Sequence, residues 1–128
     1  NARYHIIGDF DLVTRIALHW DINCFQEPVG YYRFHGDNES IKHKDLHVRE
    51  LEHWYIEMSE NPAIANLDKF KTFIFQLDYL KAVNCVDRNK YIYAIKVLYY
   101  LPICIQKFKL LFIIIAPNLL VKLLRTGI

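Results

Sequence analysis

The chain has 128 residues, of which 53% are hydrophobic, so it has enough apolar material for a core and is not a disordered tail. Its four glycines and four prolines argue against a loop-dominated or all-β protein and favour long helices. The net charge of +2 is unevenly spread, because residues 1–87 hold all fourteen acidic residues against nine basic ones, whereas residues 88–128 hold seven basic residues and no acidic one. A basic, apolar C-terminal part suits an anionic membrane face or nucleic acid, although a solvated basic surface explains it too.

The N-terminal region is predicted to contain one helix and two short strands. Asp9 or Asp11 can cap a helix over residues 11–20, whose apolar residues recur at helical spacing. Aromatic and β-branched residues then predict strands over residues 23–26 and 29–35.

Two helices are predicted in the middle of the chain. Ser40 or Asp45 can cap the first, which ends near residues 61–62, where an Asn-Pro pair stands. The second is long, and its apolar residues cover a broad face over residues 63–86.

The C-terminal region is also predicted to be helical. Asp87 can cap a helix over residues 89–100, which ends before Pro102. The periodic apolar residues of that helix are Ile92, Ile95 and Leu98. Residues 103–128 have a helical pattern that Pro117 interrupts.

The cysteines and the first residues bear on the cellular context. Cys24, Cys85 and Cys104 form an odd number without a close pair, which indicates reduced core thiols rather than a disulfide framework or a zinc site. Residues 1–11 lack a charged segment followed by an apolar one, so they do not form a signal peptide, and there is no initiating Met. We therefore expect the chain to begin inside a longer protein.

The first group of candidate functional residues is Gly8-Asp9-Phe10-Asp11-Leu12 with Arg15. A structural role explains it, because the macrodipole favours acids at a helix start and Asp11 with Arg15 has the i,i+4 spacing of an ion pair. A functional role requires one carboxylate at the helix N-terminus, beside a pocket, where it can take a proton from an attacking hydroxyl.

The second group runs from Tyr31 to Ser40, where a predicted strand brings Arg33 and His35 to the edge of a turn. A neutral imidazole is the commonest side-chain metal ligand, and the Arg fork matches phosphate oxygens. A lone His in such a place is more often a surface residue than a ligand.

Together the two groups resemble the family 2 glycosyltransferases of bacteria. The order and spacing carry the likeness: Asp9-Phe10-Asp11-Leu12 with Arg15, then Glu27-Pro28, then Tyr32-Arg33-x-His35 with Asn38 and Ser40. It covers residues 4 to about 58, and residues 88–128 resemble the helical extension of cell-surface polysaccharide members. The resemblance implies the C-terminal part of a GT-A catalytic domain over residues 1–60, followed by a helical extension with a basic apolar tail over residues 61–128. The expected fold class is therefore α+β, mostly helical, with two short strands.

The resemblance also implies roles for individual residues. Asp9 would be the general base that deprotonates the acceptor hydroxyl, whereas Asp11 would be structural and Arg15 would hold the helix or the loop before it. Many members have Glu directly before this base, whereas this sequence has Gly8. The base is kept, but any role that the family assigns to the preceding Glu is weakened here. Arg33 and His35 are the candidates for binding the nucleotide diphosphate: His35 would lie close to it and to its divalent metal, Mg or Mn, and Arg33 would lie beside His35 or anchor the strand.

The implied reaction transfers a sugar from a nucleotide-sugar donor to a glycan or lipid-linked acceptor in cell-surface polysaccharide synthesis, with inversion at the anomeric carbon. The donor-binding strands and the Asp-x-Asp metal motif of the family would precede residue 1. This part alone is therefore expected to be inactive. The full enzyme would be cytoplasmic and peripheral on the inner face of the plasma membrane.

A rival interpretation is a non-enzymatic helical module that binds a membrane surface or another protein, with the early acids acting as caps only. A nucleic-acid-binding domain is disfavoured, because the cations of the tail are interleaved with too many aliphatic residues.

The tail itself allows two interpretations. The apolar run 110–116 is too short for a bilayer crossing, which needs about 20 apolar residues. Lysines before this run and the cations Lys122 and Arg125 after it predict a helix lying on a membrane. Alternatively, residues 110–124 pack on the catalytic domain as ordinary core.

Overall fold

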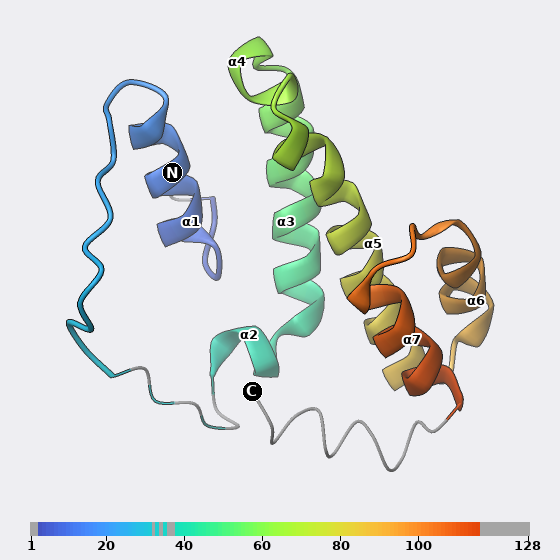
Figure 1. Cartoon of the computed structure of the whole chain (residues 1–128). Coiled ribbons are helices and arrows are strands. Elements are labelled where there is room, and N and C mark those ends of the chain that lie inside the picture. The colour runs from blue at the N-terminus through green and yellow to red at the C-terminus, as the bar shows by residue number, and fades with distance from the viewer. Residues whose placement is uncertain (1–2, 32, 34, 36–37, 116–128) are drawn as a thin grey trace. The chain divides into compact units, whose positions relative to one another are not determined.

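The computed structural model describes residues 3–31, 33, 35 and 38–115, and every regular element within them is a helix (Figure 1). The chain divides into two compact units, residues 1–65 and residues 66–128, compared with the predicted boundary after residue 60. The helices are α1 (Gly8–Ala17), α2 (Glu39–Lys42), α3 (Lys44–Ser59) and α4 (Pro62–Ala65) in the first unit, and α5 (Asp68–Asp87), α6 (Tyr91–Tyr100) and α7 (Ile105–Ile115) in the second.

The two predicted strands are not formed, so the prediction of an α+β fold of the GT-A type is wrong for the described residues. Residues 21–31 instead run as an exposed irregular segment between α1 and α2 (Figure 1). Phe25 and Val29 favour extended backbone, but a strand is stable only when a neighbouring strand pairs with its N–H and C=O groups. No described residue of this chain supplies such a neighbour.

The helix starts of the first unit also differ from the predicted caps. α1 begins at Gly8 with Ile7 as its N-cap, so Asp9 and Asp11 lie inside the first turn and neither caps the helix. The non-helical backbone of His43 separates α2 from α3, which likewise leaves Ser40 and Asp45 within first turns.

The long helix predicted over residues 63–86 is two helices. The backbone of Leu67 is extended and separates α4 from α5. α5 ends at Asp87, and two residues later Asn89 has a φ of 60°, the left-handed conformation that Asn tolerates better than most residues. Asp87 is consequently the last residue of α5 and does not cap α6.

The second unit is built around one apolar cluster, where α6 and α7 pack against the C-terminal half of α5 (Figure 1). The cluster contains Ala82, Val86, Ala94, Val97, Leu101, Leu110 and Ile113. On α6 the buried residues are Ala94 and Val97, whereas the predicted stripe residues Ile92 and Ile95 are exposed. α6 is apolar on nearly all sides, so its periodicity could not identify the face that packs; the small side chains of Ala94 and Val97 allow a close approach to the neighbouring helices.

The cysteines are free thiols, and Cys24 is exposed, so the prediction that all three belong to the core is wrong for Cys24. Cys85 and Cys104 are partly buried. Residues 116–128 lie outside the described residues, and with them Pro117 and the two tail cations Lys122 and Arg125. Within the described part of the chain no helix combines the length and the apolar character needed to cross a membrane.

Candidate functional site

The N-terminus of α1 is held by a carboxylate from another helix. Glu50 on α3 is buried and accepts hydrogen bonds from three consecutive backbone N–H groups, those of His5 at 2.9 Å, Ile6 at 2.9 Å and Ile7 at 3.1 Å. Burial by itself raises the pKa of Glu50, but these hydrogen bonds outweigh burial and the pKa is lowered overall. Glu50 thus satisfies N–H groups that precede α1 and fixes the chain just before Gly8.

A second set of charged contacts holds the middle of α1. Asp11 is fully buried and both of its carboxylate oxygens accept from the Nε of Arg15 at 2.9 Å. Arg15 Nη2 donates to Glu57 Oε1 on α3 at 2.6 Å, and the Tyr4 hydroxyl donates to Glu57 Oε2 at 2.8 Å. The hydrogen bonds from Arg15 and then from Tyr4 lower the pKa of Glu57. Burial, followed by the bond to Glu57, raises the pKa of Tyr4 to about 12.

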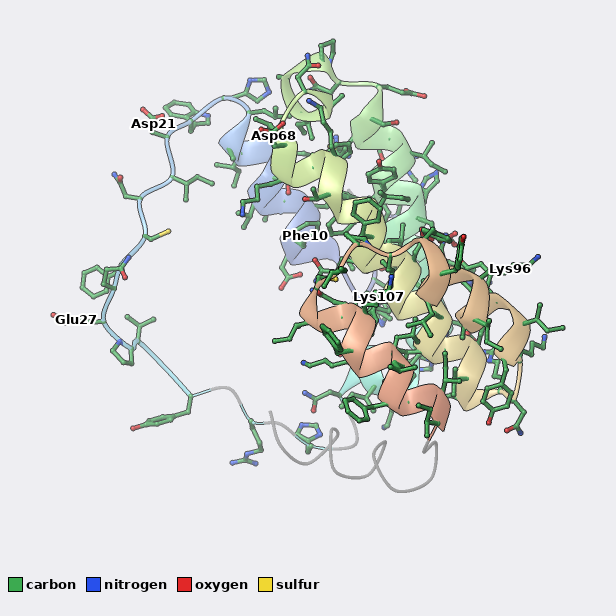
Figure 2. The ribbon with its side chains drawn as sticks, turned by 45° about the vertical axis from the view of Figure 1, so that its right-hand side comes forward. Phe10, Asp21, Glu27, Asp68, Lys96 and Lys107 are labelled. Carbon is green, nitrogen blue, oxygen red and sulfur yellow. The ribbon has the colours of Figure 1, made fainter. Side chains whose placement is uncertain are left out.

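Asp9 lies in the same first turn but is exposed. One of its oxygens accepts from the backbone N–H of Phe10 at 2.8 Å. The Phe10 ring packs on Trp54 of α3 with 4.6 Å between ring centroids, and Figure 2 shows Phe10 on α1. Asp9 is therefore an accessible carboxylate next to an anchored residue, at a helix N-terminus that favours its negative charge.

Arg33 and His35 lie in the segment before α2, and both are exposed. Asn38, the N-cap residue of α2, fixes the backbone at His35: its side-chain oxygen accepts from the His35 N–H at 3.1 Å, and its own N–H donates to the His35 carbonyl at 3.2 Å. No hydrogen bond or ion pair within the described residues joins Asp9 to Arg33 or His35.

The resemblance implies a divalent metal, which would need a group of ligand side chains. The described residues contain no group of three His, Cys, Asp or Glu side chains that could hold a metal ion. His35 therefore belongs to no such group among the described residues.

Sequence reasoning did not identify Glu50 and Glu57, which anchor α1. A signal was present: Glu50, Trp54 and Glu57 are spaced four and three residues apart, so they share one face of α3. Because Trp54 belongs to the apolar face, acids on that same face require buried partners. The partners come from residues about forty-five positions earlier in the chain, at Tyr4 to Ile7, and from Arg15.

Comparison with protein-family models, with curated proteins and with solved structures finds no match in any of the three.

Proposed function

We propose that this chain provides the acceptor-side part of a glycosyltransferase that moves a sugar from a nucleotide-sugar donor to a glycan or lipid-linked acceptor. The order and spacing of the motifs from Gly8 to Ser40 carry the proposal. One structural observation supports it: Asp9 is exposed at the start of a firmly held helix, whereas Asp11 is enclosed and bound to Arg15. An α+β fold is not part of the proposal.

The chemistry assigned to Asp9 is a proton transfer. The acceptor hydroxyl oxygen bonds to the anomeric carbon, the bond from that carbon to the diphosphate oxygen breaks, and the hydroxyl proton passes to the Asp9 carboxylate. Attack from the side opposite the leaving diphosphate inverts the anomeric carbon. A general base must be reachable by the acceptor, and among the two acids of α1 only Asp9 is exposed.

Arg33 and His35 are assigned to the diphosphate side of the donor in the same proposal. Both side chains are exposed, and Asn38 holds the backbone at His35. The planar guanidinium can donate two parallel hydrogen bonds to phosphate oxygens. In the same proposal the enzyme works at the cytoplasmic face of the plasma membrane as a peripheral protein, where it can reach a lipid-linked acceptor.

The test uses the protein encoded by the complete open reading frame that contains these residues. Asp9→Asn keeps the size of the side chain and removes the proton acceptor, so we expect the turnover of sugar transfer to fall by about 10²-fold or more. Binding of the nucleotide sugar should be nearly unchanged. Initial transfer rates and donor binding by calorimetry measure the two quantities.

Asp21→Asn is the matched control, because Asp21 is an exposed acid of the irregular segment after α1 (Figure 2). Its transfer rate should equal that of the wild type. A wild-type rate for Asp9→Asn would reject Asp9 as the base. The complete open reading frame should also encode an Asp-x-Asp motif that follows a strand upstream of Asn1. If it does not, the assignment to this class of enzyme is rejected.

The second candidate is a non-enzymatic helical module that binds a membrane or a protein. The observation that favours it is the number of large apolar side chains exposed on α6 and α7, such as Tyr99 and Ile105. This candidate predicts that the complete protein transfers no sugar with any nucleotide-sugar donor and that Asp9→Asn leaves its binding unchanged.

A further inference from the structure

α7 carries an apolar stripe that the described residues of the second unit, 66–115, leave uncovered. Ile105, Phe108, Phe112 and Ile115 are separated by three, four and three residues, which is the spacing of one helix face. Their exposed fractions are 68%, 54%, 54% and 69%. The packing of α7 on its own unit therefore uses other residues.

The opposite face of the same helix supplies the core. Leu110 and Ile113 are buried in the cluster with α5 and α6. At about 100° per residue, these two residues lie on the side of α7 opposite the exposed stripe. Covering the stripe does not require any change in the core, so a partner can bind there without unfolding α7.

Lysines stand at both borders of the stripe. On the same helical geometry of about 100° per residue, Leu111, which is 38% exposed, widens the stripe on one side and Lys107 borders it there, whereas Lys109 borders the stripe on the side of Ile105. Both side chains are partly buried along their length. The Lys107 Nζ donates to the Leu101 carbonyl at the end of α6, at 2.8 Å, so its position is fixed (Figure 2). An apolar strip with a cation on each side is the arrangement of a helix that lies in a membrane interface.

The positive charge of the sequence around α7 favours an anionic partner. Residues 88–128 contain seven basic residues and no acidic residue, so the matching surface is anionic. A second copy of the chain would bring the same lysines against each other. α7 has eleven residues and a length of about 16 Å, against about 30 Å for the hydrocarbon core of a bilayer, so it can lie in the interface but not cross it.

We propose that the stripe of Ile105, Phe108, Phe112 and Ile115 docks α7 in the plane of an anionic lipid bilayer, with Lys107 and Lys109 at the headgroups. The inference extends the membrane location within the proposed function. Only the biological purpose of the docking rests on the proposed function, because docking itself can be measured without sugar transfer. Failure of one can therefore be told from failure of the other.

Flotation of the full chain with extruded vesicles tests the inference. The vesicles contain phosphatidylcholine alone or phosphatidylcholine with about one third phosphatidylglycerol. We expect flotation with the anionic vesicles only, with at least a tenfold loss at high salt because screening weakens the attraction. The double variant Phe108→Glu/Phe112→Glu should lose at least tenfold in partitioning, since it places two carboxylates at the lipid surface. Lys109→Gln should weaken flotation without abolishing it.

Ile56→Glu is the control for an added carboxylate outside α7, because Ile56 on α3 is 59% exposed. It should float like the wild type. Far-UV circular dichroism should be unchanged in all variants, since none of these side chains is in the core. Equal flotation of wild type and double variant, or absence of flotation of the wild type, would overturn the inference. Self-association of a wild type that does not float, lost in the double variant, would assign the stripe to a second copy instead.

Discussion

Asp9 and Asp11 are chemically identical and stand two residues apart, yet their surroundings give them opposite properties. Asp11 points into the unit, where Arg15 occupies both of its oxygens, and Arg15 is held in turn by Glu57. Removing a buried carboxylate from such a network lowers the stability of the folded protein, because the guanidinium loses one of its two anionic partners. Asp9 is exposed, and its negative charge is stabilised by the N-terminus of α1 and by solvent. Burial therefore separates the structural acid from the candidate base.

Replacing Asp11 should destabilise the first unit more than replacing Asp9. Asp11→Ala removes charged hydrogen bonds to Arg15, and we expect the free energy of unfolding to fall by about 1.5–3 kcal/mol. The partial exposure of Arg15 and its remaining bond to Glu57 keep the loss in this range. Urea unfolding followed by Trp54 fluorescence, in a Trp20→Phe background, measures the change.

Asp9→Ala serves as the comparison in the same experiment, and its unfolding curve should stay close to that of the background protein. Equal destabilisation by the two substitutions would show that Asp11 does not have the anchoring role derived from its burial.

At the scale of the elements, the junction of α5 and α6 depends on one backbone conformation. The Lys90 N–H donates to the Cys85 carbonyl at 2.8 Å, and the Asn89 N–H donates to the Val86 carbonyl at 2.9 Å. This pair of bonds, with Asn89 at φ 60°, is the Schellman arrangement that ends helices. The reversal it produces lets α6 return onto α5 and bury Ala94 against it.

A β-branched residue at position 89 should loosen this junction. Asn89→Val must place a branched side chain in the left-handed region, at a cost of about 1–2 kcal/mol. Amide hydrogen exchange at Lys90 should therefore become roughly 5- to 30-fold faster if local opening controls it. Nuclear magnetic resonance measures the exchange.

Asn89→Gly is the conservative control, because glycine adopts the same φ without steric cost, and exchange at Lys90 should remain near the wild-type rate. Slow exchange in the valine variant would mean that the junction is held by packing rather than by the turn.

On the scale of the whole chain, the carboxylates with lowered pKa, Glu50 and Glu57, both belong to residues 1–65. Each is more acidic in the folded state than its ordinary value of 4.5. Their stabilising effect is fully present above that ordinary value and is lost as the pH falls through the folded-state pKa. Burial lowers the pKa of His47 as well, so its neutral form is favoured and stability begins to fall below about 6.5.

Acid should therefore loosen the first unit in two stages, a small one below about pH 6.5 and a larger one below about pH 4.5. Trp54 fluorescence in the Trp20→Phe background follows this unit, because residues 66–128 contain no tryptophan. Glu50→Gln should lower stability at neutral pH and flatten the dependence below pH 4.5.

Glu60→Gln, at the exposed end of α3, is the control for that acid titration and should leave the profile unchanged. A Glu50→Gln profile with the wild-type slope would remove Glu50 as a source of acid sensitivity.

The sequence by itself determined that helices dominate, roughly where they lie, and which residues are candidates for the site. Apolar spacing, scarce glycine and scarce proline are local properties, so they predict helices without knowledge of distant residues. The pairing of Asp11 with Arg15 is local too, since it lies within one helix turn. The strands predicted over residues 23–26 and 29–35 are absent from the described residues of these segments, because local preference cannot supply the neighbouring strand that a sheet requires.

Only the tertiary structure decided which faces are buried and which acids are anchors. α6 and α7 are apolar on more than one side, so the choice of Ala94 over Ile92, and of Leu110 over Phe112, depends on how three helices fit around a common core. Glu50 and Glu57 became anchors of α1 because folding brings them to backbone and side-chain donors far away in the sequence. The local spacing of Glu50, Trp54 and Glu57 places these acids on the apolar face of α3, but it does not identify their partners, because hydrogen bonding between distant segments is a property of the packed chain.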